Sequence, residues 1–320
     1  MKEDLLEILC CPECKGNLSL RAEIIENGEV KEGLLTCGKK QYKISNYIPR
    51  FIDSDKYVSS FSFEWKAHKN TQLDSANRNS IMAGQSRRDF EKRVDFSLSE
   101  LKNKWVLDAG CGMGRFSEVV VSEGANLVAV DLSFAVDMAL KNIGLVRNVH
   151  FMQADIFNLP LREGYFDFVY SFGVLHHTPD CQRAFAAVAK LVKPGGKLAI
   201  FVYSSYNKGI VYMSSIWRFV TTRLPKRLLY LLSFISAPLY YIYKIPVLGN
   251  IAKMFFVIPM WPDWRWRVLD TFDWYSPKYQ SKHTHWEVFG WFEKNGFEQM
   301  RIFEGEITMS GEKSAKKGLS

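Results

Sequence analysis

The central third of the chain predicts an α/β fold built on a doubly wound parallel sheet. Residues 103–203 alternate short apolar runs with segments of helical periodicity, the pattern of strands joined by crossover helices. A glycine-rich loop, Gly110 to Gly114, follows the first apolar run. Two carboxylates, Asp131 and Asp155, follow the second and third runs, at the strand ends where such sheets bind ligands.

Each strand is predicted from an apolar run that ends at a polar residue or a glycine. The five runs of the central region lie at 105–108, 127–130, 149–152, 166–171 and 197–203. Helices are predicted at 116–123 and 181–192, and the segment 193–196 (Lys-Pro-Gly-Gly) is predicted as a turn.

Length, charge and cysteine usage restrict the class of protein. The 320 residues suffice for one large α/β core and a small additional module. The first nine residues lack an apolar signal core, and the six cysteines do not suggest a disulfide scaffold, so we expect a reducing, cytoplasmic setting. The net charge of +8 favours anionic partners, whether nucleic acid, a membrane surface or an acidic substrate.

The glycine loop and the two carboxylates have the chemistry of a nucleoside site. Glycines let the backbone turn tightly and approach a ligand, and the following helix offers free N–H groups to a carboxylate. Asp131 can accept two hydrogen bonds from a ribose diol, and Asp155 can accept from an adenine amino group. The alternatives stay open that the loop is an ordinary turn, Asp131 a helix N-cap and Asp155 a turn residue.

In this order and spacing, the motifs resemble those of class I S-adenosylmethionine-dependent methyltransferases. Segment 106–116 (Val-Leu-Asp-Ala-Gly-Cys-Gly-Met-Gly-Arg-Phe) resembles motif I. The later motifs are matched by 130–133, 154–155, 166–177 and 191–198. The resemblance implies a seven-stranded sheet that ends in a hairpin, for which 297–303 and 306–310, after a helix at 286–294, are suitable.

The same resemblance implies S-adenosylmethionine as the cofactor and an in-line displacement at its methyl group. It places the methionine end on the glycine loop, the ribose on Asp131, the adenine beside Ile156 and the sulfonium over Phe172. The residues that it assigns to the cofactor are Asp108, Gly110, Cys111, Gly112, Asp131, Leu132, Asp155, Ile156, Phe172 and Gly173.

Two histidines are the candidates for catalysis. His176 follows the fourth strand and is predicted to face the mouth of the site as a base, ahead of His177. His283 belongs to a polar and aromatic segment, 273–284, that suits substrate contact. The alternatives are a structural role for the His-His pair and a packed loop at 273–284 that N-caps the next helix. Tyr275 and Tyr279 are further candidates for substrate contact.

The N-terminal segment has the cysteine spacing of a zinc knuckle. Cys11 and Cys14 form a C-x-x-C pair, and Cys37 lies at a suitable distance for a second half-site. The segment resembles the Trm112-like zinc ribbon, which implies bound zinc, but residues 38–41 supply no fourth cysteine or histidine. Cys10 would replace it only with distortion, so a ribbon without metal is the alternative.

The chain is therefore expected to divide into three parts. Residues 1–52 form the ribbon, 53–102 a helical connector and 103–320 the methyltransferase domain, in which 204–284 is an aromatic-rich insertion after the fifth strand. In that insertion, 228–243 carries no charge and is too short for a membrane span. It is a lid over an apolar substrate, a peripheral membrane contact or a homodimer interface.

The sequence favours a methyltransferase that acts on a small or lipid-like molecule, at oxygen. The alternative is an RNA methyltransferase, which the basic charge allows, although the insertion is apolar rather than a stripe of Lys and Arg between aromatics. A cofactor-binding scaffold that activates a partner is a third, non-enzymatic reading.

Overall fold

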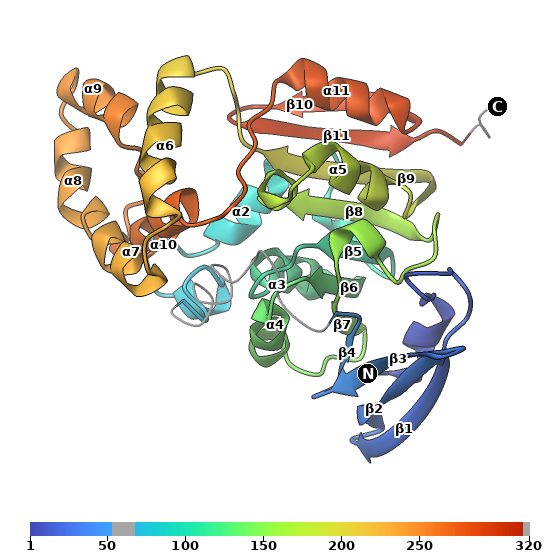
Figure 1. The fold of residues 1–320 in the computed structure, drawn as a ribbon. Coiled ribbons are helices and arrows are strands. Elements are labelled where there is room, and N and C mark those ends of the chain that lie inside the picture. Colours follow the sequence, from blue (N-terminus) through green and yellow to red (C-terminus); the bar gives the residue numbers. More distant parts are fainter. Residues whose placement is uncertain (53–67, 316–320) are drawn as a thin grey trace.

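The computed structural model describes residues 1–52 and 68–315, and one continuous sheet runs through it (Figure 1). The sheet has eleven strands in the order β1-β2-β3-β4-β7-β6-β5-β8-β9-β11-β10. Its parallel centre consists of β5 (Trp105–Ala109), β6 (Asn126–Asp131), β7 (Val149–Gln153), β8 (Phe166–Phe172) and β9 (Val192–Val202). The predicted α/β class with a doubly wound sheet is confirmed.

The C-terminal hairpin closes one edge of this sheet. Strand β11 (Ile307–Lys313) pairs antiparallel with β9, and β10 (Phe297–Phe303) pairs antiparallel with β11. Together with the five parallel strands these two make the seven strands that the methyltransferase resemblance implies.

Four N-terminal strands extend the seven-stranded sheet to eleven. They are β1 (Ser19–Glu26), β2 (Glu29–Cys37), β3 (Lys40–Ser45) and β4 (Ile48–Arg50), and they form an antiparallel meander. Arg50 of β4 then pairs in parallel with Gln153 of β7. The Arg50 guanidinium donates to Asp137 at 2.7 Å and to the Gln153 side chain at 2.9 Å, so the ribbon is joined to the sheet edge by charge as well as by backbone.

Two helical layers cover the sheet because its strands alternate their side chains. Val106 and Leu127 pack in one apolar cluster, which includes residues of α2 (Gln85–Glu91), α3 (Arg115–Ser122) and α4 (Ala135–Ile143). Leu107 and Val128 pack in the other cluster, with residues of α5 (Cys181–Ala189) and α11 (His285–Lys294). Short 3-10 turns are η1 (Glu3–Glu7), η3 (Ser75–Asn77), η4 (Leu98–Leu101), η5 (Ile156–Asn158) and η6 (Leu175–His177).

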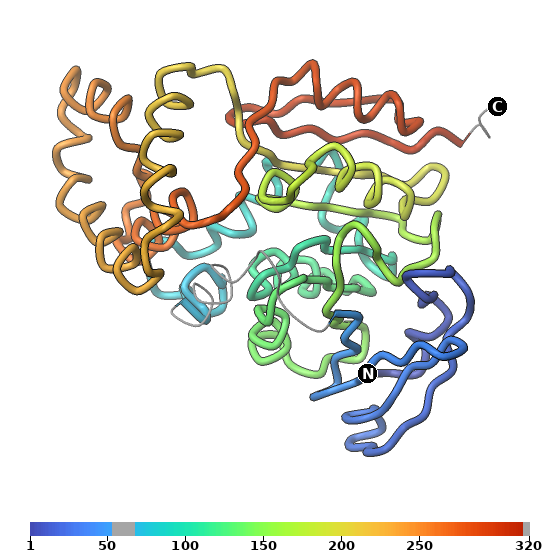
Figure 2. Tube along the Cα trace, viewed as in Figure 1, coloured from blue at the N-terminus to red at the C-terminus, as the bar shows by residue number. Residues whose placement is uncertain are grey.

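The insertion after β9 is a helical module beside the sheet (Figure 1). Its helices are α6 (Lys208–Thr221), α7 (Lys226–Ser233), α8 (Ser236–Tyr243), α9 (Leu248–Phe255) and α10 (Trp264–Tyr275). Helix α10 is central, with Trp266, Phe272 and Tyr275 buried. The chain leaves and re-enters the sheet through neighbouring segments, where Ser204 and His283 form a parallel bridge (Figure 2).

The structure differs from the sequence prediction at the start of β9. Segment 193–196, predicted as a turn, lies within β9, and α5 ends at Ala189. A Cβ at Gly196 would lie 2.8 Å from the carbonyl oxygen of Asp167, so only glycine lets the two strands approach there. The three-part division of the chain stays a prediction, and residues 53–67 of its connector lie outside the described residues.

None of the helices in the described ranges combines the length and apolar character needed to cross a membrane.

Candidate functional site

A cavity of about 650 Å³ lies at the C-terminal ends of the parallel strands. One wall comes from the loop after β5 and from the ends of β6, β7 and β8. The opposite wall comes from the end of β9, from 257–261 and from α10. The helical insertion thus closes a site whose floor belongs to the sheet.

The glycine loop, residues 110–114, forms part of the first wall. Gly110 and Gly112 have φ angles of 97° and 53°, which favour glycine. A Cβ at Gly110 would lie 2.4 Å from a methyl group of Val174, so no other residue fits there without displacing that side chain. The backbone N–H of Gly112 donates to the Asp131 carboxylate at 2.8 Å.

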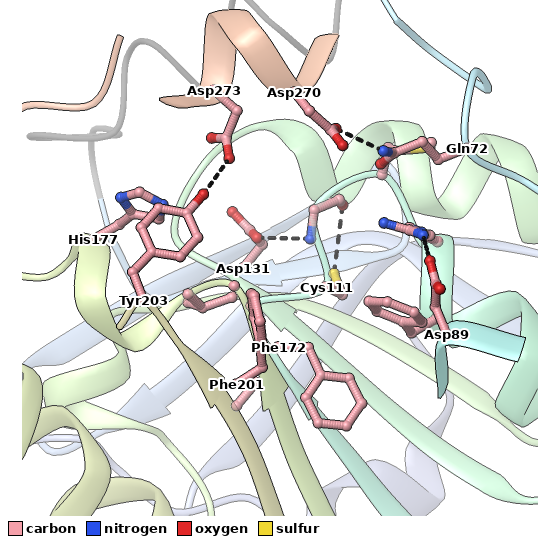
Figure 3. A pocket seen from close by; sticks show the side chains of 18 of the residues that line it. Gln72, Asp89, Cys111, Asp131, Phe172, His177, Phe201, Tyr203, Asp270 and Asp273 are labelled. Atoms are coloured by element: carbon pink, nitrogen blue, oxygen red, sulfur yellow. Dashed lines mark hydrogen bonds and ion pairs between the residues drawn. The ribbon is translucent and has the colours of Figure 1, made fainter. Parts of the chain in front are cut away.

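Asp131 stands at the centre of this wall (Figure 3). Its second oxygen accepts from the N–H of Ser133 at 2.7 Å and from the Ser133 hydroxyl at 2.6 Å. Burial raises the pKa of Asp131, while the bonds from Ser133 and Gly112 oppose that rise. Eight of the ten predicted cofactor residues line the cavity: Gly110, Cys111, Gly112, Asp131, Leu132, Ile156, Phe172 and Gly173.

The other two predicted cofactor residues do not line the cavity. The Asp108 carboxylate lies beneath the loop, where it accepts from Ser117 Oγ at 2.6 Å and from the Tyr170 hydroxyl at 2.8 Å. Burial raises the pKa of Asp108 to about 7. Asp155 caps η5 by accepting from the Phe157 N–H at 3.1 Å. Both side chains therefore shape the loops beside the cavity rather than its surface.

The second wall combines aromatic and aliphatic side chains with acidic groups, of which Asp273 of α10 is one (Figure 3). The Tyr203 hydroxyl donates to Asp273 Oδ2 at 3.3 Å. Asp273 Oδ1 is buried and has no hydrogen-bond partner within the described ranges. Burial raises the pKa of Asp273 to about 7, and the negative charge of Asp270 adds to the rise.

Asp270, one helical turn before Asp273, also lines the cavity. Its two oxygens accept from the Gln72 amide at 2.8 Å and from the Trp261 indole N–H at 2.5 Å. The sequence analysis did not select Asp270, and it included Asp273 only as the first residue of segment 273–284. They are the two acidic residues of an aromatic-rich helix, at i, i+3 spacing, but that signal did not reveal which face of α10 turns to the cavity.

A half-buried cation, Arg93, lines the cavity where the two walls meet. The Arg93 guanidinium is 4.9 Å from the ring centre of Phe201 and donates to the backbone oxygen of Asp89 at 2.5 Å. Burial, reinforced by the charge of Arg115, lowers the pKa of Arg93 to about 10. At neutral pH it remains charged and makes this part of the cavity suitable for an anionic group.

The histidines predicted as catalytic residues lie outside the cavity lining. His176 is fully buried and packs on Tyr203, with ring centres 4.0 Å apart. Burial holds its pKa well below the usual range. His283 lies with Nε2 2.8 Å from the Ser281 hydroxyl. His177, the less favoured of the pair, does line the cavity, and its Nδ1 lies 3.0 Å from the Tyr279 carbonyl oxygen.

The segment around His283 is a packed loop that starts a helix. Thr284 caps α11 in a capping box with Glu287. Tyr275 is stacked on Phe256 at 4.8 Å, and its hydroxyl accepts from the Val257 N–H at 2.8 Å. Neither Tyr275 nor Tyr279 lines the cavity within the part of the chain that the structure describes.

The predicted metal ligands Cys11, Cys14 and Cys37 lie together. Their sulfur atoms are within 4.8 Å of one another, a spacing that suits one thiolate-bound ion. No fourth Cys, His, Asp or Glu joins the cluster within the described ranges. Burial raises the pKa of the Cys11 thiol, but hydrogen bonds from the Cys14 backbone and the Tyr42 hydroxyl outweigh it and lower the pKa to about 7. The three thiols fit zinc and would supply three of its four usual ligands.

We expect the purified protein to carry about one equivalent of zinc, because three converging thiols bind it strongly. Cys14→Ser should remove the metal, since it leaves two thiols. Cys10→Ser is the matched control, as that thiol stands outside the cluster, and it should keep the metal. Elemental analysis of the three proteins makes the comparison. A wild-type protein without metal and of unchanged thermal stability after EDTA treatment would establish the ribbon without zinc.

Comparison with known proteins agrees with this arrangement. Residues 107–200 match the family model of a methyltransferase domain, and residues 2–41 match that of a Trm112p-like protein. A ubiquinone biosynthesis O-methyltransferase of Coxiella burnetii is 35% identical over 128 residues, which cover 39% of this chain and 55% of that protein. The chloroplastic tocopherol O-methyltransferase of Arabidopsis thaliana is 28% identical over 163 residues, 49% of this chain and 43% of that protein.

The chain thus spans about half the length of these relatives. Among solved structures, the magnesium protoporphyrin IX methyltransferase of Synechocystis PCC 6803 aligns with a TM-score of 0.49 at 16% identity, over 81% of this chain and 98% of that one. The sequence matches and the sheet order lead to one family assignment. The chain carries a class I S-adenosylmethionine-dependent methyltransferase domain, joined to an N-terminal Trm112p-like domain.

Proposed function

We propose that this protein transfers the methyl group of S-adenosylmethionine to an oxygen atom of a small, apolar or lipid-like acceptor. The observation that carries the proposal is the composition of the cavity. Its first wall holds the glycine loop with Asp131, and its second wall holds aromatic side chains around the Asp273 carboxylate.

The first wall fits the cofactor. Gly110 and Gly112 bring the backbone to the cavity surface, and a Cβ at Gly173 would meet no protein atom within 4 Å. The Asp131 carboxylate suits a ribose diol, and Ile156 supplies an apolar surface for the base. When bound, S-adenosylmethionine supplies a methyl group already activated by positive sulfur. The protein's part is to hold and align the acceptor.

The second wall favours an apolar acceptor of limited size. Phe201, Val257, Met260, Trp261 and Trp274 contribute to it. Because these side chains come from β9 and from the insertion, the acceptor would lie between the sheet and the helical module. A lining of this kind suits a ring or an acyl chain better than a nucleotide in a polymer, whose phosphates need exposed cations.

Asp273 is the group that we assign to accept the acceptor's proton. Oδ1 of its carboxylate needs a donor, and an acceptor hydroxyl within the cavity would provide one. A pKa near 7 suits a general base at neutral pH. Asp273 would take the hydroxyl proton while the methyl–sulfur bond breaks, the methyl group passes to the acceptor oxygen and S-adenosylhomocysteine is left; Tyr203 holds the carboxylate through Oδ2. His176 and His283 do not reach the cavity and are replaced in this role.

The test is transfer of label from S-adenosylmethionine carrying tritium in its methyl group. Purified protein is incubated with a total lipid extract and, separately, with total RNA. We expect label in the organic phase and none in RNA, and Gly110→Ala as a negative control should transfer none because its side chain blocks the loop. Label in RNA would favour the alternative function, and label in neither fraction would contradict a lipid-like acceptor.

A further inference from the structure

The outward surface of α6 to α9 is an apolar face with no protein partner in the described chain. Most of the large apolar side chains that are exposed in the described ranges lie between residues 208 and 255. Leu231, Tyr241 and Val247 are 65%, 69% and 72% exposed. We call this surface the outer face and define it by Phe219, Leu231, Ile235, Tyr241, Val247 and Phe255. A patch of this kind on a helical module marks an interaction site.

All the charged side chains of these helices are positive. Residues 208–255 contain seven Lys and Arg residues and no Asp or Glu. Two of these cations point inward and serve the fold. Lys226 Nζ donates to the Ser276 carbonyl at 2.9 Å, and Arg218 donates to the carbonyls of Trp274 and Pro277 at 3.0 and 2.7 Å.

Three of the remaining cations, Arg223, Arg227 and Lys244, are exposed. The Arg223 guanidinium lies 4.0 Å from the ring centre of Phe219. The ammonium of Lys244 lies 4.4 Å from the ring centre of Tyr240, whose side chain is buried. Apolar side chains beside Lys and Arg are the pattern of helices that lie in a membrane interface.

We propose that the outer face docks on an anionic lipid surface. A second copy of this chain is the competing occupant, but in a two-fold contact the face would meet itself. Cations would then oppose cations, with no acidic residue between 208 and 255 to neutralise them. An anionic bilayer supplies both the apolar phase and the negative charge.

The docking also gives the cavity a short connection to lipid. The segment directly after α9 supplies Val257, Pro259 and Met260 to the cavity wall. If these helices lie on a bilayer, the cavity wall is close to the acyl chains. The use of this connection by a lipid-like acceptor rests on the proposed function. The docking itself is independent of methyl transfer.

The experiment is flotation of the full chain with phosphatidylcholine vesicles, with and without added phosphatidylglycerol. We expect binding only to the anionic vesicles, and weaker binding as salt rises. Arg223→Gln with Arg227→Gln should weaken partitioning by roughly fivefold for each charge. Leu231→Ser with Ile235→Ser should weaken it by about tenfold or more.

Arg301→Gln with Ile302→Ser is the matched control, because both side chains are exposed on β10, away from the insertion. It should float like the wild type. Binding of S-adenosylhomocysteine, measured on every sample, separates loss of docking from loss of fold, and its failure in the wild type would count against the proposed function alone.

Three results would overturn the docking proposal. They are equal binding to neutral vesicles, no binding to anionic vesicles at low salt, or a dimer in sedimentation equilibrium that Leu231→Ser with Ile235→Ser dissociates.

Discussion

Replacing Asp131 with alanine should weaken binding of S-adenosylhomocysteine by roughly 1.5–3 kcal/mol, the range for hydrogen bonds to a charged group. The carboxylate is expected to accept from the ribose hydroxyls. It also anchors the glycine loop, since the Gly112 N–H donates to it at 2.8 Å. The substitution therefore removes direct contacts and loosens the backbone that surrounds the methionine end. Isothermal titration calorimetry gives the affinity.

Asp4→Ala is the matched control for this change, because the Asp4 carboxylate is exposed and belongs to the N-terminal segment. It should leave the affinity unchanged. A folded Asp131→Ala protein with wild-type affinity would remove Asp131 from the cofactor site, and the nucleoside would then have to be held by other groups.

Asp273→Asn should lower the rate of methyl transfer to lipid by a factor of about 100 to 10,000, the usual contribution of a general base. Asparagine keeps the size and the hydrogen bond to Tyr203 but cannot take the proton. Affinity for S-adenosylhomocysteine should not change. The transfer assay with tritium label measures the rate. His283→Gln is the control, because His283 is one of the two catalytic candidates predicted from the sequence.

The pH dependence of the two proteins provides a second measurement. With a pKa near 7, Asp273 is protonated at lower pH, so the wild-type rate should rise with pH up to about 8 and then level off. The raised pKa means that the folded protein holds this proton more tightly than the unfolded chain. Binding of this proton therefore adds to the free energy of unfolding. That contribution is fully present below the ordinary pKa of 3.8 and is lost as pH rises through about 7.

Asp273→Asn should therefore melt at a higher temperature than the wild type at pH 8, and the difference should shrink towards pH 4. Differential scanning calorimetry measures the melting temperatures of the two proteins at each pH. If His283→Gln abolishes transfer while Asp273→Asn does not, the base is not Asp273.

The order of the elements and the residues of the first wall of the cavity could be predicted from the sequence, because both depend on local patterns. Apolar runs and helical periodicity predicted the strands from β5 to β8 and the helices α3 and α5, with small errors at their ends. The glycine loop and Asp131 lie within a few residues of the strands that position them. Their spacing along the chain therefore places them together at the carboxyl ends of the parallel strands.

Only the tertiary structure decided which distant groups meet. Asp273 lies 70 positions along the chain from its partner Tyr203, and Gln72 lies 198 positions from Asp270. No local pattern encodes such a contact, because it depends on how the insertion folds back over the strand ends. The same holds for Arg50, which joins β4 of the ribbon to β7 of the methyltransferase sheet.

The histidines show the difference between the two levels. Strand-end position alone predicted His176 at the mouth of the site, but the η6 turn directs its ring into the core beside Tyr203. A sequence determines that a side chain stands near a strand end, through the periodicity of the elements on either side. Whether that side chain faces the cavity or the core is set by the packing of segments far away in the chain, which only the folded molecule brings together.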